Sequence, residues 1–348
     1  MCQPTPSTHH NQGFSLVEVM VAIVLGLLLT AATLQLFIGN SATFRTTDAT
    51  SRVQENARFA QSLFSKELRM TGYRGCLSKQ NVPITNTLKQ ASTLTYNFTT
   101  TLRGYNNLTS SQPTELVAHL SGDPAPLVGT DLLLIQGPVD MPVPIVANSD
   151  ANQVFANAGS ENILSVGNIA LITDCSKARI FQITGLTANG GQVNVAHSAS
   201  TSVIPGNDNA VWDPNNKTQL FGPGSELMTY QTLTYFLAIN SDSGQPALYR
   251  KVNGQPATIL LDNIFNLQIL YGTDTNSDRQ VDSYQTANNI TDWGSVLTLR
   301  LQLILGSEDT GVVTEPQAFA FNGNTFQATD SRWYMPTIIT SVLRNRLN

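Results

Sequence analysis

The chain has 348 residues, a formal net charge of −5 and only 12% charged residues. The negative charge and the lack of any basic cluster predict no direct nucleic-acid binding. The charged fraction is well below the roughly 25% of typical soluble domains, which favours an extracytoplasmic protein. The length allows a sizeable globular region in addition to a membrane-length segment.

The first informative segment is an apolar run from residue 14 to residue 38. It covers 25 residues, roughly 37 Å of helix at about 1.5 Å per residue, enough to cross a bilayer core of about 30 Å. The run carries one acid, Glu18, and a carboxylate at a bilayer centre costs about 2.5–3.5 kcal/mol. Such a residue should persist only where a positive group neutralises it. The leader before Gly13 has no Lys or Arg, unlike an ordinary secretory signal.

The run from Gly13 to Glu18 reads GFSLVE. It resembles the prepilin-peptidase site of type IV pilins and type II secretion pseudopilins. The resemblance implies cleavage between Gly13 and Phe14 on the cytoplasmic side and N-methylation of Phe14. Glu18 would then pair with an N-terminal ammonium, of its own or a neighbouring subunit, and set the axial register of a filament. The leader departs from that family's pattern because it lacks basic residues.

The helical pattern continues beyond Gly39. One apolar face recurs at spacings of three and four, at Val53, Ala57, Ala60, Phe64 and Leu68. The opposite face is polar, with Gln54, Glu55, Arg58, Ser62, Lys66 and Arg69. Gly72 is a good C-terminal stop, and Gly26 and Gly39 are places where the helix could bend. The alternative is an ordinary surface helix that follows a membrane anchor.

The chain has three cysteines. Cys2 lies in the leader and would be lost on cleavage, which leaves Cys76 and Cys175. In an oxidising compartment this pair should form one disulfide. The alternative is two free buried thiols.

The remainder alternates between loop-rich and strand-like segments. Residues 73–129 are predicted to be loops with short strands, and about 187–224 is a second loop-rich stretch. The strands are expected at residues 131–137, 163–166, 170–173, 179–184, 227–239, 247–252, 258–271 and 296–305. Residues 174–177 suit a hairpin connection, and Asn253-Gly254 is the strongest short-range hairpin signal. This order predicts an antiparallel sheet behind an N-terminal helix, an α+β fold.

One acidic turn is the candidate metal site. Its oxygen-bearing residues alternate along the chain as in a calcium loop, at Asp274, Asn276, Asp278, Gln280 and Asp282. However, Arg279 stands where the loop glycine should be, and Gln285 replaces the bidentate Glu. An Asp/Asn-rich hairpin turn explains the same residues without a metal. No other cofactor is expected.

Enzyme motifs are absent from the sequence. There is no phosphate-binding loop, no HExxH and no GxSxG. Outside the leader the histidines are His119 and His197, and we expect both to lie on the surface or in loops. The sequence therefore predicts a protein that is not an enzyme.

Three further segments resemble PilW-type minor pilins of the type IV pilus. The first is residues 271–278. The second is Arg332-Trp333-Tyr334 followed by residues 340–346. The third is residues 56–60 together with residues 72–76. The Arg344-Asn345-Arg346 tail has the alternative interpretation of a solvated strand end. The resemblance implies a pilin-like fold, with a long hydrophobic and then amphipathic helix packed on an antiparallel sheet.

The resulting division has four parts. We expect a prepilin leader at 1–13, a transmembrane and filament-core helix at 14–38, an amphipathic half-helix at 39–72 and a β-rich globular domain at 73–348. The expected location is the inner membrane, single-pass with the C-terminal domain in the periplasm, and then the pilus or cell surface. The positive-inside rule taken alone would place the N-terminus outward, because Arg45, Arg52 and Arg58 follow the span.

The expected function is that of a non-catalytic minor pilin. The resemblance implies that it primes pilus assembly, is compatible with the tip, and supports twitching, adhesion or DNA uptake. Its partners would be other minor pilins, the major pilin, the prepilin peptidase, the inner-membrane assembly machinery and the membrane. The alternatives are a minor pseudopilin of a type II secretion system and a membrane-anchored periplasmic enzyme, binding protein or adhesin.

Overall fold

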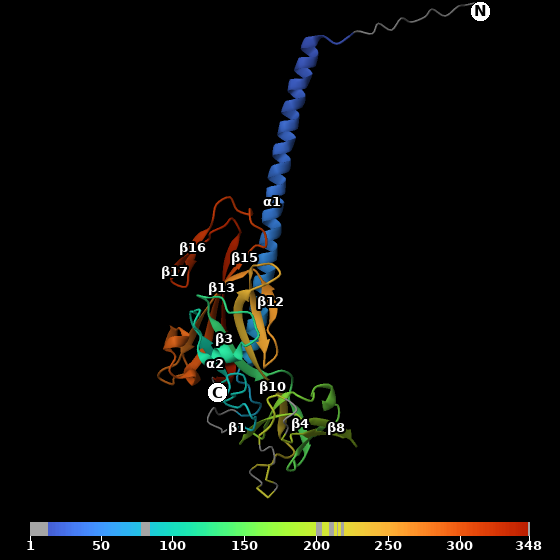
Figure 1. The fold of residues 1–348 in the computed structure, drawn as a ribbon, viewed down its shortest axis with the longest axis vertical. Coiled ribbons are helices and arrows are strands. Elements are labelled where there is room, and N and C mark those ends of the chain that lie inside the picture. The colour runs from blue at the N-terminus through green and yellow to red at the C-terminus, as the bar shows by residue number, and fades with distance from the viewer. Residues whose placement is uncertain are drawn as a thin grey trace, which may run out of the picture.

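The computed structural model describes residues 13–77, 84–199, 204–208, 212–213, 215–216 and 219–346. One long helix, α1 (Leu16–Met70), projects from a β-rich head made of two sheets and a hairpin (Figure 1). The predicted α+β class with a long N-terminal helix is therefore confirmed. The helix runs without interruption through Gly26 and Gly39. Most of the expected leader, residues 1–12, lies outside the described residues.

The N-terminal half of α1 has no contact with the described part of the head. Every residue from Gly13 to Asn40 is exposed. This half is long and apolar enough to cross a membrane. An apolar surface of this extent on one helix has to be covered by lipid or by other helices.

The C-terminal half of α1 packs on the head along the predicted face. Five predicted positions and one more are buried, namely Ala49, Val53, Ala57, Ala60, Phe64 and Leu68. The six residues predicted for the opposite face are all exposed. The helix ends at Met70, and Gly72 takes a positive φ of 72° while its N–H donates to the carbonyl oxygen of Gln136 at 2.8 Å. The 3.6-residue period and the glycine stop thus fix this half of the helix in place.

The larger sheet contains twelve strands. Their bounds are β1 (Ile84–Asn86), β2 (Leu102–Tyr105), β3 (Leu132–Pro138), β4 (Val143–Ala147), β5 (Gln153–Asn157), β6 (Ile169–Thr173), β7 (Ala178–Gln182), β8 (Gly185–Asn189), β9 (Gln192–Ala196), β10 (Glu226–Ile239), β11 (Pro246–Val252) and β12 (Thr258–Asp262). Apart from the parallel pair β1–β7, the paired strands are antiparallel. A short helix, α2 (Thr114–His119), precedes β3.

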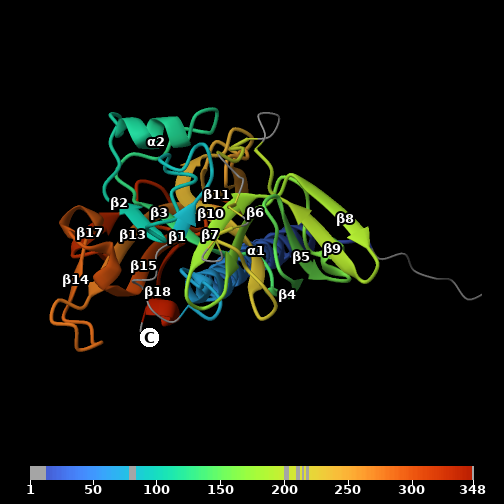
Figure 2. The ribbon, with the colours of Figure 1, turned by 90° about the horizontal axis from the view of Figure 1, so that it is seen from below.

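Strand β10 joins the two parts of this sheet. Its first residues pair with β4 and β6, whereas its later residues pair with β3 and β11. The first part extends through β5, β9 and β8 into a lobe at the end of the head farthest from the exposed half of α1 (Figure 1). From below, β5, β8 and β9 lie to one side of β1, β6 and β7 (Figure 2). This distal lobe has its own apolar core, built around Trp212, Phe181 and Phe221.

The smaller sheet has four strands and encloses the main core with α1. Their order is β14 (Ser283–Gln285), β13 (Ile264–Thr273), β15 (Val296–Gly306) and β18 (Tyr334–Val342). The buried face of α1 packs with residues of β3, β10, β13, β15 and β18 in one cluster. A separate hairpin, β16 (Ala318–Phe321) and β17 (Asn324–Gln327), packs its aromatic side chains on Tyr334 and Phe265.

Two strand predictions were wrong. Residues 163–166 follow a 3-10 turn (Ser160–Asn162) and form no strand, because only Leu164 is buried there while Ile163 and Val166 are exposed. The single run predicted over 258–271 is two strands, β12 and β13. They are separated by Asn263, whose φ of 61° breaks the extended backbone.

The loop-rich stretches hold more structure than expected. Within 187–224 the structure has most of β8 and all of β9, joined at Gly190-Gly191. Strand β9 alternates buried and half-buried residues, with Val193 and Val195 inward. Within 73–129 it has the short helix α2 besides the short strands β1 and β2. The hairpin predicted at 174–177 is confirmed by the pairing of β6 with β7.

Candidate functional site

The start of α1 is closed by a reciprocal pair of hydrogen bonds. The N–H of Ser15 donates to Glu18 Oε2 at 2.8 Å, and the N–H of Glu18 donates to Ser15 Oγ at 3.2 Å. This is a capping box, which satisfies two backbone donors that the first helical turn leaves unpaired. The S-x-x-E spacing of Ser15 and Glu18 is the sequence signal for this capping box. From the sequence, however, Glu18 was interpreted only as a charge that needs a partner. Glu18 therefore already holds the backbone next to the expected cleavage point.

The expected cleavage point itself is open. Gly13, Phe14 and Ser15 precede the helix, and the Phe14 side chain is 87% exposed. Among the described residues, and apart from its chain neighbours, no atom lies within 4 Å of the position that a Cβ on Gly13 would occupy. The described residues on either side of the expected cleavage point are therefore accessible. Gly13 and Phe14 lie just before the capping box, and Glu18 lies in the first turn of α1.

The other end of α1 is held by the C-terminal tail. The side-chain amide of Asn345 donates to the carbonyl oxygen of Arg69 at 3.1 Å and to that of Thr71 at 3.2 Å. These carbonyls belong to the last helical turn and its cap, where intrahelical partners run out. The Arg344–Arg346 segment is a 3-10 turn after β18 rather than a free strand end. Sequence reasoning singled out this tail but not the contact, which joins residues 276 positions apart.

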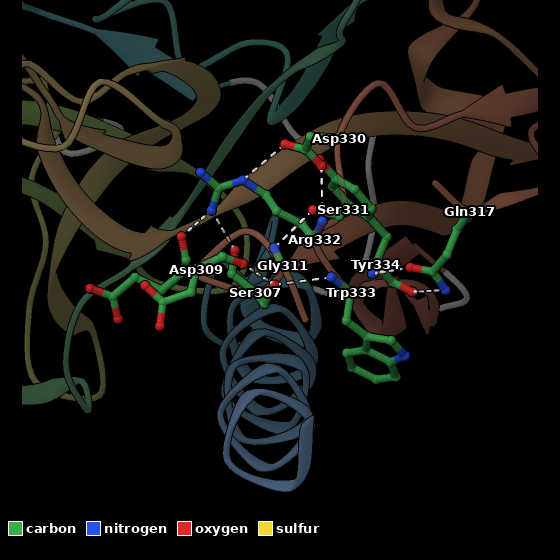
Figure 3. A network of polar contacts seen from close by, with 10 residues as sticks. Ser307, Asp309, Gly311, Gln317, Asp330, Ser331, Arg332, Trp333 and Tyr334 are labelled. Atoms are coloured by element: carbon green, nitrogen blue, oxygen red, sulfur yellow. Dashed lines mark hydrogen bonds and ion pairs between the residues drawn. The ribbon is translucent and has the colours of Figure 1, made fainter. Parts of the chain in front are cut away.

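A buried arginine organises the loop that follows β15. Arg332 is 7% exposed and its Nε pairs with Asp330 Oδ2 at 3.1 Å. Its Nη1 donates to the carbonyl oxygen of Ser307 at 2.8 Å and also to that of Glu308. Figure 3 shows the guanidinium between Asp330 and this loop. A charged group with three fixed acceptors holds the loop in one conformation.

Further bonds tie the same loop to the segment that leads into β18. The Trp333 N–H donates to Ser307 Oγ at 3.0 Å, and the Gly311 N–H donates to Ser331 Oγ at 2.8 Å (Figure 3). The Tyr334 hydroxyl donates to Asp330 Oδ1 at 2.9 Å. Burial and this carboxylate raise the pKa of Tyr334 above its ordinary value. Arg332, Trp333 and Tyr334, which the sequence singled out as one motif, thus act together in one network.

The loop also touches α1 where the helix leaves the head. Thr46 Oγ1 donates to the carbonyl oxygen of Val312 at 3.3 Å, and Arg52 Nη1 lies 3.7 Å from Glu308 Oε2. Arg52 also pairs with Asp48 at 2.9 Å. These pairs are exposed and contribute little to stability. They nevertheless place residues 307–312 beside the first buried turn of the helix, at Ala49.

The predicted disulfide between Cys76 and Cys175 is present, with the two sulfur atoms 2.01 Å apart. It joins the segment that follows α1 to the β6–β7 hairpin. The Asp174 carboxylate shapes that hairpin, because its Oδ1 accepts from the N–H groups of Ser176 and Lys177 at 3.1 and 3.0 Å. The bridge therefore ties the end of the helix to the distal part of the head.

The acidic turn is held by its own side chains. Asp274 accepts from the N–H groups of Asn276, Ser277 and Arg279, and Asp282 Oδ2 accepts from Thr275. The Asn276 amide bridges Asp278 Oδ2 and Asp282 Oδ1 at 3.3 and 3.4 Å. Gln280 donates its N–H to Asp278 at 2.8 Å. Nowhere in the described chain do three His, Cys, Asp or Glu side chains gather as a metal-binding group. Calcium binding stays a prediction.

Both histidines are buried. The expectation of surface or loop histidines was wrong for His119, which ends helix α2, whereas His197 does lie in a loop, after β9. The two ring nitrogens of His119 lie 2.8 Å from the hydroxyls of Thr95 and Thr234. Burial, helped by the charge of Lys251, lowers the pKa of His119 to about 4. His197 is stacked on Trp212 at 3.9 Å between ring centroids in the distal core. Both rings complete packed cores that local sequence does not reveal.

Two family models match the chain. One is described as the prokaryotic N-terminal methylation motif and matches residues 8–34. The other is described as type IV pilus-assembly protein W (PilW) and matches residues 234–346. No curated protein and no solved structure matches the chain. The first match contains Gly13, Phe14 and Glu18. The second covers the smaller sheet, the acidic turn, Arg332 and Asn345, whereas the similar segments at 56–60 and 72–76 lie outside both.

Proposed function

We propose that this chain, a PilW-like type IV pilin by its N-terminal motif and by residues 234–346, is a minor pilin that primes pilus assembly. In this role it is a non-catalytic subunit processed between Gly13 and Phe14. It waits in the inner membrane with its head in the periplasm, and then joins the filament together with other minor pilins and the major pilin. Its position is at the tip, and twitching, adhesion and DNA uptake depend on it indirectly.

The observation that carries the proposal is the tip of α1. A carboxylate stands in the first turn of a helix whose next twenty-odd residues are apolar and exposed. Before cleavage the Ser15 N–H satisfies this carboxylate. Cleavage would create a cationic amine on Phe14, one residue ahead of that N–H. The amine of this or a neighbouring subunit then neutralises Glu18 in a low-dielectric filament core, where an unpaired carboxylate is costly.

The rigid attachment of the head to α1 supports the same role. The buried face of α1, the Asn345 contact and the Arg332 network fix the head on the helix at three levels. A subunit that passes force or register through its helix needs such a fixed joint. The distal lobe lies at the far end of the molecule (Figure 1), which is where a tip subunit would meet a surface.

The experiment is the Glu18→Ala variant in cells that lack the native chain. We expect the variant to reach the membrane and to be processed, but to be missing from sheared pili, with reduced piliation and twitching. Val17→Ala is the matched control, because it removes an exposed neighbour without changing charge. Normal piliation and motility of Glu18→Ala would overturn the assembly role of this residue.

The same experiment separates the rivals. A membrane-anchored periplasmic binding protein would keep an uncleaved N-terminus and would tolerate Glu18→Ala. A minor pseudopilin would leave piliation intact and instead impair secretion of exoproteins.

A further inference from the structure

Strand β8 of the distal lobe is an open edge of the larger sheet. In the described chain the edge strands of this sheet are β1, β2, β8 and β12, and β8 pairs with β9 alone. The other three carry features that hinder pairing with a further strand. Strand β1 has only three residues, β2 carries Arg103, and β12 contains a bulge and ends at Asp262. Strand β8 has no charged residue and no proline, and its register with β9 runs without a shift.

Two backbone hydrogen bonds show how β9 faces its neighbours. The N–H of His197, directly after β9, donates to the carbonyl oxygen of Asn152 at 3.0 Å, on the side of β5. Because backbone groups alternate between the two sides of a strand, the even-numbered residues of β9 face β8. The N–H of Thr184 agrees with this direction, because it donates to the carbonyl oxygen of Ala196 at 2.8 Å.

The register with β9 then fixes what the open edge of β8 offers. Thr187 lies opposite Asn194 and turns its backbone groups toward β9, so Leu186 and Ala188 turn theirs away from it. The Leu186 side chain packs on the distal core, whereas Thr187 lies on the other face and is exposed. The edge therefore presents N–H and C=O groups at two positions, with apolar side chains on one face and a hydroxyl on the other.

This edge is complementary to itself. Its outward-facing residues, Leu186 and Ala188, lie symmetrically on either side of Thr187. If a second β8 approaches antiparallel with Thr187 opposite Thr187, each Leu186 lies opposite the Ala188 of the other copy, and each such pair exchanges both of its hydrogen bonds. On the apolar face Leu186 then covers Ala188, and on the exposed face the two threonines form a favourable cross-strand pair. No charge on β8 opposes the approach.

The orientation of the distal lobe allows this approach. Figure 2 looks along the long axis of the molecule and shows β5, β9 and β8 side by side, with β8 outermost. A two-fold axis along this view brings two β8 edges together and keeps both α1 helices pointing the same way. Two chains anchored in one membrane require that alignment, and this step alone rests on the proposed function.

We propose that β8 binds the β8 strand of a second copy of this chain, antiparallel and with Thr187 on the two-fold axis, so that the two distal lobes share one sheet. The contact uses the same surface of both copies and is therefore closed at two. It lies at the end of the head farthest from the exposed half of α1 (Figure 1). The paired surface is small, and confinement of both chains to one membrane supports it by raising their effective concentration.

The test is disulfide trapping of full-length Thr187→Cys in membranes, in a Cys2→Ser background that removes the leader thiol. In the proposed pair the two Thr187 Cα atoms lie about 4.5 Å apart, which a disulfide can bridge. Mild oxidation should therefore give a covalent homodimer on a non-reducing gel. Asn189→Cys is the matched control, because Asn189 is exposed on the same face of β8. At about 3.4 Å per residue its two copies lie about 14 Å apart, so the dimer yield should be about tenfold lower.

A block of the open edge provides the second arm. Ala188→Pro removes the outward N–H but no bond to β9, and in the Thr187→Cys chain it should lower the dimer yield about tenfold. Ala188→Ser keeps the N–H and should leave the yield unchanged, while an unchanged thermal melt shows that Ala188→Pro is folded. A Thr187→Cys yield no higher than that of Asn189→Cys, or equal yields with Ala188→Pro and Ala188→Ser, would overturn the proposal.

The two proposals fail separately. A chain that is cleaved at Gly13 and required for piliation but never forms the Thr187→Cys dimer overturns the β8 contact alone. A chain that forms this dimer with an uncleaved N-terminus overturns the pilin function alone.

Discussion

Asn345 donates its side-chain amide to the carbonyl oxygens of Arg69 and Thr71, and so closes the last turn of α1 from a residue at the far end of the fold. A helix end normally needs a glycine or a local side chain for this purpose. Here Gly72 turns the chain, and a residue that follows β18 supplies donors. The contact makes the register between helix and smaller sheet depend on the tail.

Replacing Asn345 should loosen this joint. Because Asn345→Ala removes two partly exposed hydrogen bonds, we expect the free energy of unfolding to fall by about 1 kcal/mol. Thermal melts of the full chain in detergent provide the measurement. Arg344→Ala is the control and should leave the melt unchanged, because its exposed side chain lies beside the contact but does not make it. Equal losses from both variants would contradict the specific role of Asn345.

Replacing Arg332 should lower the free energy of unfolding far more than replacing Asn345. Arg332→Met leaves Asp330 and two carbonyl oxygens without their buried donor, which costs about 3–5 kcal/mol when one partner of a buried pair is removed. Chemical denaturation measures the loss. Hydrogen exchange at residues 307–312 should also speed up, since the loop loses its support. Arg279→Met, in the exposed acidic turn, is the matched control; a loss for Arg332→Met no larger than for this control would refute the network.

Protonation of the buried His119 should lower the stability of the protein in mild acid. Its pKa in the folded protein is about 4, whereas an unfolded histidine has a pKa of about 6.5. The unfolded state therefore binds more protons in this window, and stability falls by up to about 1.4 kcal/mol per pH unit between pH 6.5 and 4. His119→Gln should flatten this part of the profile, although it is less stable at neutral pH. Parallel profiles for both proteins would show that another group causes the acid loss.

Calcium binding by the acidic turn is a proposal that chelation can decide. The side-chain amide of Asn276 donates to the carboxylates of Asp278 and Asp282. A cation bound between these carboxylates would take the place of that amide as their positive partner. We expect a chelator to lower the melting temperature by a few degrees, and Asp278→Asn with Asp282→Asn to abolish the difference. If chelator and added calcium leave the native melt unchanged, the turn binds no calcium.

Elements with a local period were predictable from the sequence. The buried face of α1 at Val53, Ala57, Ala60, Phe64 and Leu68 follows from a 3.6-residue repeat that needs no knowledge of the partner. The pairing of Cys76 with Cys175 followed because cleavage of the leader leaves only two cysteines. Strand β10 was visible as a long run of apolar and β-branched residues.

Contacts between distant segments were not predictable. The buried carboxylate of Asp131 accepts from the N–H groups of Asn107 and Ile269 at 2.7 Å each, and so links the two sheets. Burial raises its pKa, which these bonds partly offset. No local sequence signal near Asp131 indicates that Asn107 and Ile269 are its partners. The same holds for Asn345 and for His119, whose environments exist only after the sheets have packed.

The mature protein should begin at Phe14 and enter a filament. N-terminal sequencing by mass spectrometry of the protein recovered from sheared pili can show both. We expect an N-methylated Phe14 as the first residue. A protein found only in the membrane fraction and still carrying residues before Phe14 would contradict it.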